Sequence, residues 1–304
     1  MHRRPRITIV GAGNLGTALA MCLHRAGYVI DQVVFRNSGA SRRRAAALAK
    51  RVGARAVDVA RATIDSDVVW LCVPDDAVAK VERSLAQKSD WKGRVALHSS
   101  GALASDEMAA LRGRGALAAS VHPLMTFVAG SRQAGSSRTD LLHTGLLHTG
   151  SQPSLAGVPF AIEGDAPAVR ASRAIVKELG GKAYTIRRQD KVAYHAWGTF
   201  ASPLLTALLA TTEHVAAAAG VNRREAKRRM LPILQQTLAN YVALDAAGAF
   251  SGPIVRGDVE TIRRHLRVLR KVPEAGEVYA ALAKAAVRYL PGRRKPQVAR
   301  LLNK

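Results

Sequence analysis

The sequence predicts an α/β protein in which a Rossmann-type, doubly wound and mainly parallel sheet precedes a smaller all-helical domain. A glycine-rich loop at residues 11–16 follows a short apolar run and opens an amphipathic stretch. From residue 6 to about residue 121, short β-branched runs alternate with alanine-rich helical stretches, which is typical of βαβ units on a parallel sheet. After residue 188 the strand pattern ends, and the pattern is helical to residue 302.

Apolar runs define the strands of the expected sheet. They lie at residues 7–10, 32–35, 68–73, 94–98, 117–121, 159–163 and 183–186. Helical patterns connect them, for example at residues 40–52, 106–112 and 166–179. A chain of 304 residues with 48% hydrophobic content exceeds one ordinary domain. We expect a Rossmann-like domain at residues 1–188 and a helical domain at residues 189–304.

A segment rich in Ser, Gly and Thr interrupts the first domain at about residues 129–156. It holds a tandem copy of Leu-Leu-His-Thr-Gly, at residues 141–145 and 146–150. The two histidines could serve as ligands, but a duplicated surface loop with incidental histidines explains the pattern more simply. We therefore expect a loop insertion here.

Composition limits the partners of the protein. The formal net charge of +24 would suit a polyanion. However, the basic residues are spread along the chain in helical patterns, and aromatic residues, at 5%, are too few for a stacking platform. We do not expect nucleic acid as the main partner.

The cysteine content and the length of the apolar runs bear on disulfides, metal sites and cellular location. Cys22 and Cys72 are the two cysteines, and both lie in apolar patterns, so no disulfide framework is expected. No His, Cys or Glu cluster has metal-ligand spacing, so we expect no metal site. No apolar run reaches the ~18 to 20 residues that cross a bilayer. The basic start of the chain runs directly into the glycine loop, and we expect a cytoplasmic protein without a membrane segment.

The glycine loop predicts a dinucleotide-binding site. Gly11 permits the tight turn, Gly13 lets the backbone approach a pyrophosphate, and Gly16 allows the helix to pack closely on the strand. With Asn14 and Leu15, these residues begin a helix whose N–H groups face the phosphates.

The residues after the second strand favour NADP (NADPH) over NAD. An acidic residue about twenty positions beyond the loop would bind the ribose hydroxyls of NAD, but Arg36 stands there. Arg36, Asn37 and Ser38 suit a 2′-phosphate. Arg42 and Arg43 could reinforce the site or face solvent.

The next strand end adds two further residues to the expected cofactor site. Val73 and Pro74 end the central strand, where they would lie beside the nicotinamide ribose, although a plain turn explains them equally well.

Two histidine motifs end the later parallel strands, where ligands collect in open α/β folds. They are His-Ser-Ser-Gly at residues 98–101 and His-Pro-Leu-Met at residues 122–125. Hydride transfer needs a partner that gives or takes a proton, and His122 is our first candidate. Ser99 and Ser100 could hold a substrate oxygen or cap the turn that follows.

The first helix after residue 188 carries two more candidates. Lys191 and His195 are four residues apart and therefore share one helix face. They could point into a cleft between the domains, with Lys191 as acid or electrostatic anchor and His195 as substrate contact. A snorkelling lysine and a packed histidine are the alternative.

These motifs together resemble a known family. The residues concerned are the glycine loop and residues 71–74, 98–102, 121–124, 160–165, 191–196 and 251–258. They are similar to the uncharacterised Rossmann-like proteins with a C-terminal domain of unknown function, in the 6-phosphogluconate dehydrogenase-like superfamily. Relatives there include pyrroline-5-carboxylate reductase, ketopantoate reductase and prephenate dehydrogenase. The resemblance implies an NADP-dependent oxidoreductase, usually dimeric through its helical domain, with no settled substrate.

The relatives also suggest roles for single residues. Prephenate dehydrogenases carry a histidine-proline pair that resembles His122 and Pro123, and its histidine assists oxidation of the substrate hydroxyl. Hydroxyacid dehydrogenases of the superfamily carry a catalytic lysine that Lys191 matches loosely, four residues before an asparagine that His195 replaces here. Many close relatives have Asn where this chain has Pro203, which should bend the helix.

A last motif lies near residue 256. Arg256 could clamp a substrate carboxylate. Alternatively, the motif is a turn with Asp258 as the N-cap of a helix and Thr261 in its first turn.

We therefore expect an enzyme that moves a hydride between NADPH and a small carbonyl, imine or hydroxy-acid substrate in the interdomain cleft. The alternative is a non-catalytic NADP-binding sensor or assembly protein. The expected partners are a small-molecule substrate and a second copy of the chain.

Overall fold

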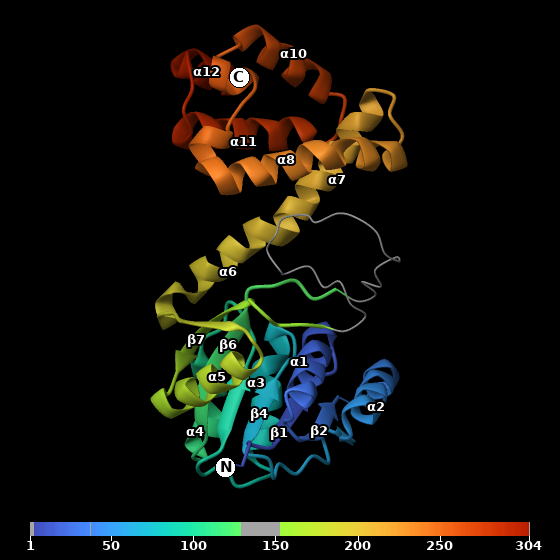
Figure 1. Ribbon diagram of the computed structural model, residues 1–304, viewed down its shortest axis with the longest axis vertical. Helices are drawn as coiled ribbons and strands as arrows, with labels where there is room; N and C mark the ends of the chain where they lie inside the picture. The colour runs from blue at the N-terminus through green and yellow to red at the C-terminus, as the bar shows by residue number, and fades with distance from the viewer. Residues whose placement is uncertain (1–2, 37, 129–152, 304) are drawn as a thin grey trace. The chain divides into compact units, whose positions relative to one another are not determined.

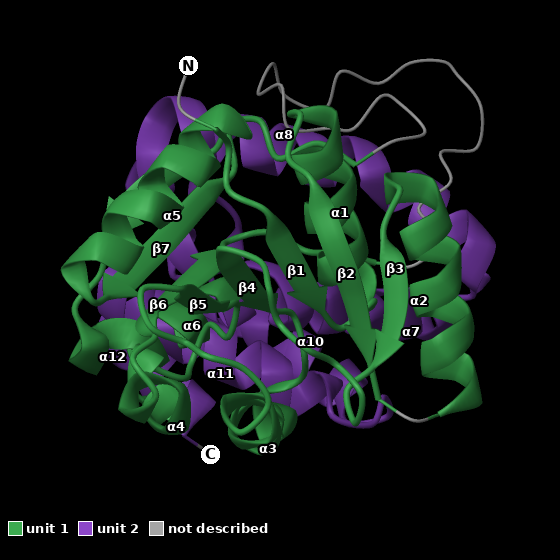
Figure 2. Cartoon of the chain, turned by 90° about the horizontal axis from the view of Figure 1, so that it is seen from below, with its two compact units in different colours: residues 1–198 green, residues 199–304 purple. Residues whose placement is uncertain are grey.

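The computed structural model describes residues 3–36, 38–128 and 153–303, and the chain divides into two compact units (Figure 2). Unit 1 comprises residues 1–198 and unit 2 residues 199–304. Unit 1 thus extends past the boundary expected near residue 188, because the helix that begins at Lys191 buries this lysine against the sheet. The duplicated segment at residues 141–150 lies outside the described residues.

The described part of unit 1 is built on one eight-stranded sheet of order β3-β2-β1-β4-β5-β6-β7-β8. Neighbouring strands are parallel except β6 and β7, which are antiparallel. The strands are β1 (Ile7–Val10), β2 (Ile30–Phe35), β3 (Arg55–Asp58), β4 (Val68–Leu71), β5 (Val95–His98), β6 (Leu117–Pro123), β7 (Pro159–Gly164) and β8 (Lys182–Thr185). The mainly parallel sheet predicted from the sequence is confirmed.

Helices cover both faces of this sheet, as the two hydrophobic cores show. Because side chains alternate along a strand, Ile9 joins the core packed by α1 (Asn14–Arg25), α2 (Gly39–Val52) and α5 (Ala166–Glu178). Its neighbour Val10 joins the opposite core, packed by α3 (Asp75–Ala86) and α4 (Ala109–Gly113). The doubly wound arrangement is confirmed (Figure 1).

Two local differences from the expected elements have physical reasons. Strand β3 was not predicted, because as an edge strand it is partly exposed and its sequence, Arg-Ala-Val-Asp, lacks an apolar run. The helix expected at residues 106–112 is a 3₁₀ turn (Ser105–Met108) followed by the short α4.

Unit 2 is helical throughout its described residues. Its helices are α7 (Leu205–Ala218), α8 (Arg223–Ala249), α9 (Pro253–Arg256), α10 (Val259–Leu269), α11 (Ala275–Tyr289) and α12 (Lys295–Leu302). A small core of Ile262, Ala283, Val298 and Leu302 joins α10, α11 and α12.

The bend expected at Pro203 takes the form of a π-helical turn. Residues Phe200–Leu204 form this turn, and α7 follows it directly. A proline has no N–H for the helical ladder, so the backbone widens locally around it. The first segment of unit 2 is therefore helical but not regular.

Within the described residues, no single helix has both the length and the apolar content needed to cross a membrane. The segments Arg188–Ala218 and Arg223–Arg256 reach these values only when taken as a pair, and the pair is bent by 118°.

Candidate active site

The loop between β1 and α1 has the geometry that its glycines predict. Gly11 has a φ of +102°, and a Cβ there would lie 2.5 Å from the Cys72 carbonyl oxygen. A Cβ on Gly16 would lie 2.0 Å from the Gly11 carbonyl oxygen. The fold therefore requires glycine at both positions. Gly13 differs, because a Cβ there would meet no atom within 4 Å.

The N-terminus of α1 is open to an anion. Gly13 is its N-cap residue, and no side chain caps the helix. The first N–H groups and the positive end of the helix dipole therefore point toward the space beside Gly13. The Asn14 side chain donates instead to the Phe127 carbonyl oxygen (2.9 Å), and the Leu15 side chain packs against the core. Asn14 and Leu15 can thus contribute backbone N–H groups to a pyrophosphate.

A cleft of about 340 Å³ runs along this loop. Its lining comes from the carboxyl ends of β1, β2 and β4 and from α2 and α3. The lining residues are Val10, Gly11, Ala12, Gly13, Asn14, Val34, Phe35, Arg36, Ser41, Arg44, Val59, Cys72, Val73, Pro74, Ala77 and Val81. The structure thus brings together the glycine loop, Arg36, Val73 and Pro74, as the sequence predicts. Ser38 lies beside the cleft as the N-cap of α2, and its Oγ accepts from the Ser41 N–H (3.3 Å). Asn37 lies outside the described residues.

Two arginines line the β2 side of the cleft. Arg36 follows β2, and Arg44 lies on α2, three residues after Ser41. Neither guanidinium pairs with a carboxylate within the described part of the chain. Two such cations beside a hydroxyl suit a phosphate monoester. The sequence raised Arg42 and Arg43 but not Arg44, which lines the cleft from α2.

The turn after β5 uses its serine hydroxyls for structure. The Ser99 Oγ accepts from the Trp70 indole (2.8 Å), and the Ser100 Oγ accepts from the Leu103 N–H (2.9 Å). The His98 Nδ1 accepts from the Ser100 N–H (3.2 Å). Burial lowers the pKa of His98 to about 4, so this imidazole is a neutral part of the turn. Both hydroxyls therefore bond within the protein around this turn, in line with the structural rather than the substrate-binding interpretation of Ser99 and Ser100.

His122 has a defined tautomer. Its Nδ1 lies 3.0 Å from the Ser99 carbonyl oxygen, which can only accept, so Nδ1 carries the proton. The neutral ring therefore presents the Nε2 lone pair. Burial lowers the pKa of His122, and the nearby Lys191 ammonium lowers it further, so that together they outweigh the hydrogen bond to Ser99. The ring is thus held as a neutral hydrogen-bond acceptor.

Lys191 begins α6 (Lys191–Thr199) and is 1% exposed. Its Nζ donates to the Ser120 Oγ (2.7 Å) and to the Ser100 carbonyl oxygen (3.1 Å). Burial lowers its pKa to about 8, against the attraction of Glu163 and Asp75. The sequence identified Lys191 but missed Ser120, which lies two residues before His122 and therefore on the same face of β6.

Residues of α6 place aromatic rings beside His122. The rings of His122 and His195 are 5.9 Å apart and edge-on, and Tyr194 lies 6.1 Å from His122. A Cβ on Gly101 would lie 2.5 Å from His195 Cδ2 and 3.0 Å from His122 Nε2. The absence of a side chain at Gly101 therefore lets both imidazoles approach the turn after β5. The structure brings together all five residues predicted as catalytic. His122, Lys191 and His195 contribute side chains to this cluster, whereas Ser99 and Ser100 contribute backbone carbonyl oxygens.

The candidate motif of unit 2 follows the helix-cap interpretation. The two Asp258 carboxylate oxygens accept from the Thr261 N–H (3.2 Å) and the Thr261 Oγ1 (2.8 Å), and Asp258 precedes α10. Arg256 ends the short α9.

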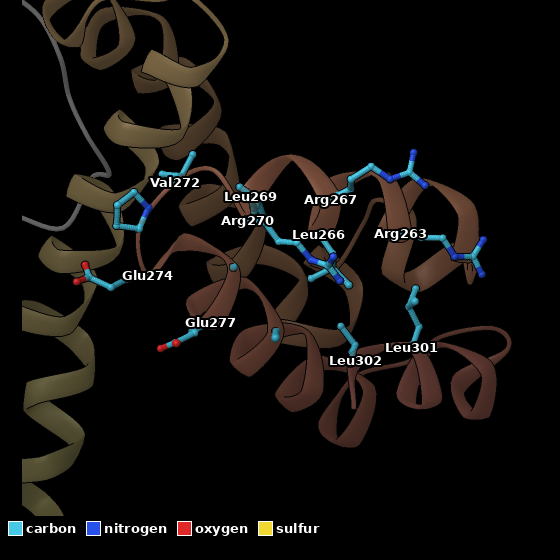
Figure 3. Close-up of a pocket in the computed structure, with 13 residues that line it drawn as sticks. Arg263, Leu266, Arg267, Leu269, Arg270, Val272, Glu274, Glu277, Leu301 and Leu302 are labelled. Atoms are coloured by element: carbon cyan, nitrogen blue, oxygen red, sulfur yellow. The ribbon is translucent and has the colours of Figure 1, made fainter. Parts of the chain in front are cut away.

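Unit 2 also contains a cavity of about 720 Å³ (Figure 3). Arg263 and Arg267 of α10, Arg270 at its C-cap and apolar residues such as Leu266 and Leu302 line it. It holds none of the acid-base candidates.

Two family models match the chain. A Rossmann-like domain matches residues 1–123, and a domain of unknown function, DUF2520, matches residues 158–286. The protein is therefore a Rossmann-like protein with a DUF2520 domain, and the family predicted from the motifs is confirmed. No curated protein gives a significant match.

Solved structures share the fold over nearly the whole chain. A Bacteroides fragilis protein described as an NADP oxidoreductase is 21% identical, with a TM-score of 0.73 over 92% of this chain and 97% of its own. An imine reductase from Myxococcus stipitatus in complex with NADP⁺ is 17% identical, with a TM-score of 0.63 over 98% and 100%. A reductive aminase from Aspergillus terreus in complex with NADPH and ethyl levulinate is 17% identical, with a TM-score of 0.64 over 99% of each chain.

Proposed function

We propose that the protein is an NADP-dependent oxidoreductase that moves a hydride between NADPH and a small carbonyl, imine or hydroxy-acid substrate. The observation that carries this proposal is the adjacency of two features on one sheet edge. The glycine-loop cleft follows β1 and β4, and the cluster of His122 and Lys191 follows β5 and β6. The carboxyl edge of a parallel sheet is where open α/β folds bind ligands.

The residues of the cleft fit NADP. The open space beside Gly13 and the uncapped N-terminus of α1 suit a pyrophosphate, and Arg36 with Arg44 suits a 2′-phosphate. Solved relatives were crystallised with NADP⁺ or NADPH, which agrees with this choice.

The cluster fits proton transfer that accompanies hydride transfer. The bound cofactor supplies or accepts the hydride. His122 presents an unprotonated Nε2, which can take the proton of a substrate hydroxyl or accept a hydrogen bond from a substrate N–H. Lys191 supplies a positive charge that stabilises developing negative charge on a substrate oxygen or nitrogen. Two of the solved relatives are described as an imine reductase and a reductive aminase, and we include imines in the substrate class for this reason.

Cofactor binding is tested first. Binding to purified protein should change the fluorescence of NADPH, and titration should give a Kd for NADPH at least tenfold lower than the Kd for NADH. Equal or tighter binding of NADH would contradict the assignment of Arg36 and Arg44.

Turnover is tested with panels of keto acids, cyclic imines and hydroxy acids, by following NADPH absorbance. Turnover should be lost when His122→Ala and Lys191→Ala are combined. If NADPH binds but no panel member is turned over, and if binding changes the oligomeric state independently of His122, the alternative of a non-catalytic NADP sensor holds.

The second copy expected from the sequence remains a proposal, and exposed apolar side chains of α8 support it. Ile233, Tyr241 and Val242 are 66%, 59% and 70% exposed. Large apolar side chains exposed on one helix favour association. Light scattering should give the mass of a dimer, and a monomer that persists at micromolar concentration would contradict this. The cytoplasmic location and the minor role of nucleic acid likewise stay predictions.

A further inference from the structure

A buried hydrogen-bonded junction joins the two acid-base candidates. Ser120 is fully buried, and its Oγ accepts from Lys191 Nζ (2.7 Å) and donates to the Ser100 carbonyl oxygen (3.3 Å). Lys191 Nζ also donates to that carbonyl oxygen (3.1 Å). The adjacent Ser99 carbonyl oxygen accepts from His122 Nδ1 (3.0 Å). One short backbone segment therefore receives bonds from Lys191, Ser120 and His122.

The register of the sheet makes this junction rigid. On β6, Ser120 and His122 are two residues apart and point to the same face. Ser120 pairs with His98 on β5 and with Glu163 on β7. The Glu163 carboxylate accepts from the Ser105 N–H (2.6 Å) and the Ser105 Oγ (2.9 Å). Ser120 is thus fixed from both neighbouring strands, and its hydroxyl is in place before any ligand binds.

We propose that Ser120 is a positioning residue of the reaction: its hydroxyl holds the Lys191 ammonium against the Ser99–Ser100 turn, and it thereby couples Lys191 to the orientation of His122. This inference rests on the proposed function, since the reaction it positions is the proposed one. No motif of the sequence points to Ser120, and its role follows from the contacts alone.

The charges around Lys191 explain why the hydroxyl matters. Burial disfavours the ammonium, while Glu163 on β7 and Asp75 on α3 favour it. His98 on β5 and His122 on β6 also face it, and its charge helps to keep both imidazoles neutral. An ammonium in this setting depends on its acceptors, because a buried charge without hydrogen bonds is strongly unfavourable. Removal of the Ser120 hydroxyl should therefore lower the pKa of Lys191 further.

The test measures Lys191 directly. Full-length protein labelled with ¹³Cε-lysine is titrated by NMR, and the Lys191 resonance is assigned by its loss in Lys191→Arg. In Ser120→Ala the apparent pKa of Lys191 should fall by about one unit, since a hydrogen bond to a charged group contributes roughly that much. Ser120→Thr, which keeps the hydroxyl, should restore the value.

The matched control is Ser172→Ala. Ser172 is also fully buried, and its Oγ donates to the Ala168 carbonyl oxygen within α5 (2.7 Å), so this variant loses a buried hydroxyl elsewhere in unit 1. It should leave the pKa of Lys191 unchanged. Equal pKa values of Lys191 in Ser120→Ala, Ser172→Ala and wild type would overturn the proposal.

A second readout separates this proposal from the proposed function. If a substrate is found, Ser120→Ala should move the alkaline limb of the kcat profile to lower pH by the same amount as the NMR shift, with an unchanged Kd for NADPH. An alkaline limb that stays in place would overturn the positioning role even where turnover supports the proposed function. Absence of all turnover would refute the proposed function, while the NMR shift would still decide whether Ser120 holds Lys191.

Discussion

Lys191 should give the protein a pH-dependent stability that can be measured without substrate. The side chain is 1% exposed, and burial lowers its pKa from the ordinary 10.5 to about 8. Between these two values the unfolded chain binds more protons than the folded chain, so stability rises with pH in that interval. At pH 7 the group is charged in both states. At pH 9 it is neutral in the folded state, one unit above its pKa, and this stabilises the fold by about 1.4 kcal/mol relative to pH 7.

The measurement compares wild type with Lys191→Met. Urea unfolding followed by tryptophan fluorescence at pH 7, 8 and 9 gives the free energy of unfolding of each protein. The difference, wild type minus variant, should grow by about 1.4 kcal/mol from pH 7 to pH 9, because the other titrating groups are common to both proteins. The exposed Lys177→Met is the control and should show no such change. A difference that is constant with pH would refute the reasoning, since Lys191 would then ionise alike in both states.

Four further variants test the glycines and the cleft. Gly13→Ala should leave the Tm unchanged, because its Cβ meets no atom within 4 Å, yet it should weaken NADPH binding at least tenfold in a fluorescence titration. Gly16→Ala should lower the free energy of unfolding by about 1–3 kcal/mol, because its Cβ would lie 2.0 Å from a backbone oxygen. Arg44→Gln should raise the Kd for NADPH about tenfold and leave that for NADH unchanged, and equal effects on both would place Arg44 away from the 2′-phosphate. Gly101→Ala should lower kcat without changing the Kd for NADPH, because its Cβ would displace His122 and His195, and a normal kcat would exclude these imidazoles from the reaction.

The fold could be predicted well because its interior strands bury both faces. Ile7–Val10 and Val68–Leu71 are fully buried, and their β-branched and apolar sequences stand out between helical patterns. The edge strand Arg55–Asp58 buries little and has no such run. Its existence depends on pairing with β2, which the local sequence does not encode.

The residues of the candidate site could be predicted in part, because strand ends mark the ligand edge of a parallel sheet. His122 and Lys191 were found by motif and spacing. The hydrogen-bond partner of each polar atom could not be predicted from the sequence. Ser99 and Ser100 gained a catalytic interpretation from their position, but their hydroxyls bond to Trp70 and Leu103. Such assignments depend on distances between strands, and these follow from the register of the whole sheet.

The distribution of buried polar groups supports the sheet edge as the site on energetic grounds. Lys191, Ser120, Ser100 and His98 are all buried, and they form one connected network. A well-packed apolar set of similar volume would often be as stable or more stable, since burying an ammonium has a large desolvation cost. The Val68–Leu71 strand in the same sheet is apolar and fully buried, so this fold accommodates apolar side chains at interior strand positions. The buried Lys191 network therefore lowers stability without being required by the fold. Such destabilising polar groups are expected where their charge and hydrogen bonds take part in catalysis. If Lys191→Met proves more stable than wild type at pH 7 and also inactive, both parts of this argument hold; a less stable, fully active variant would mean that the network serves the fold alone.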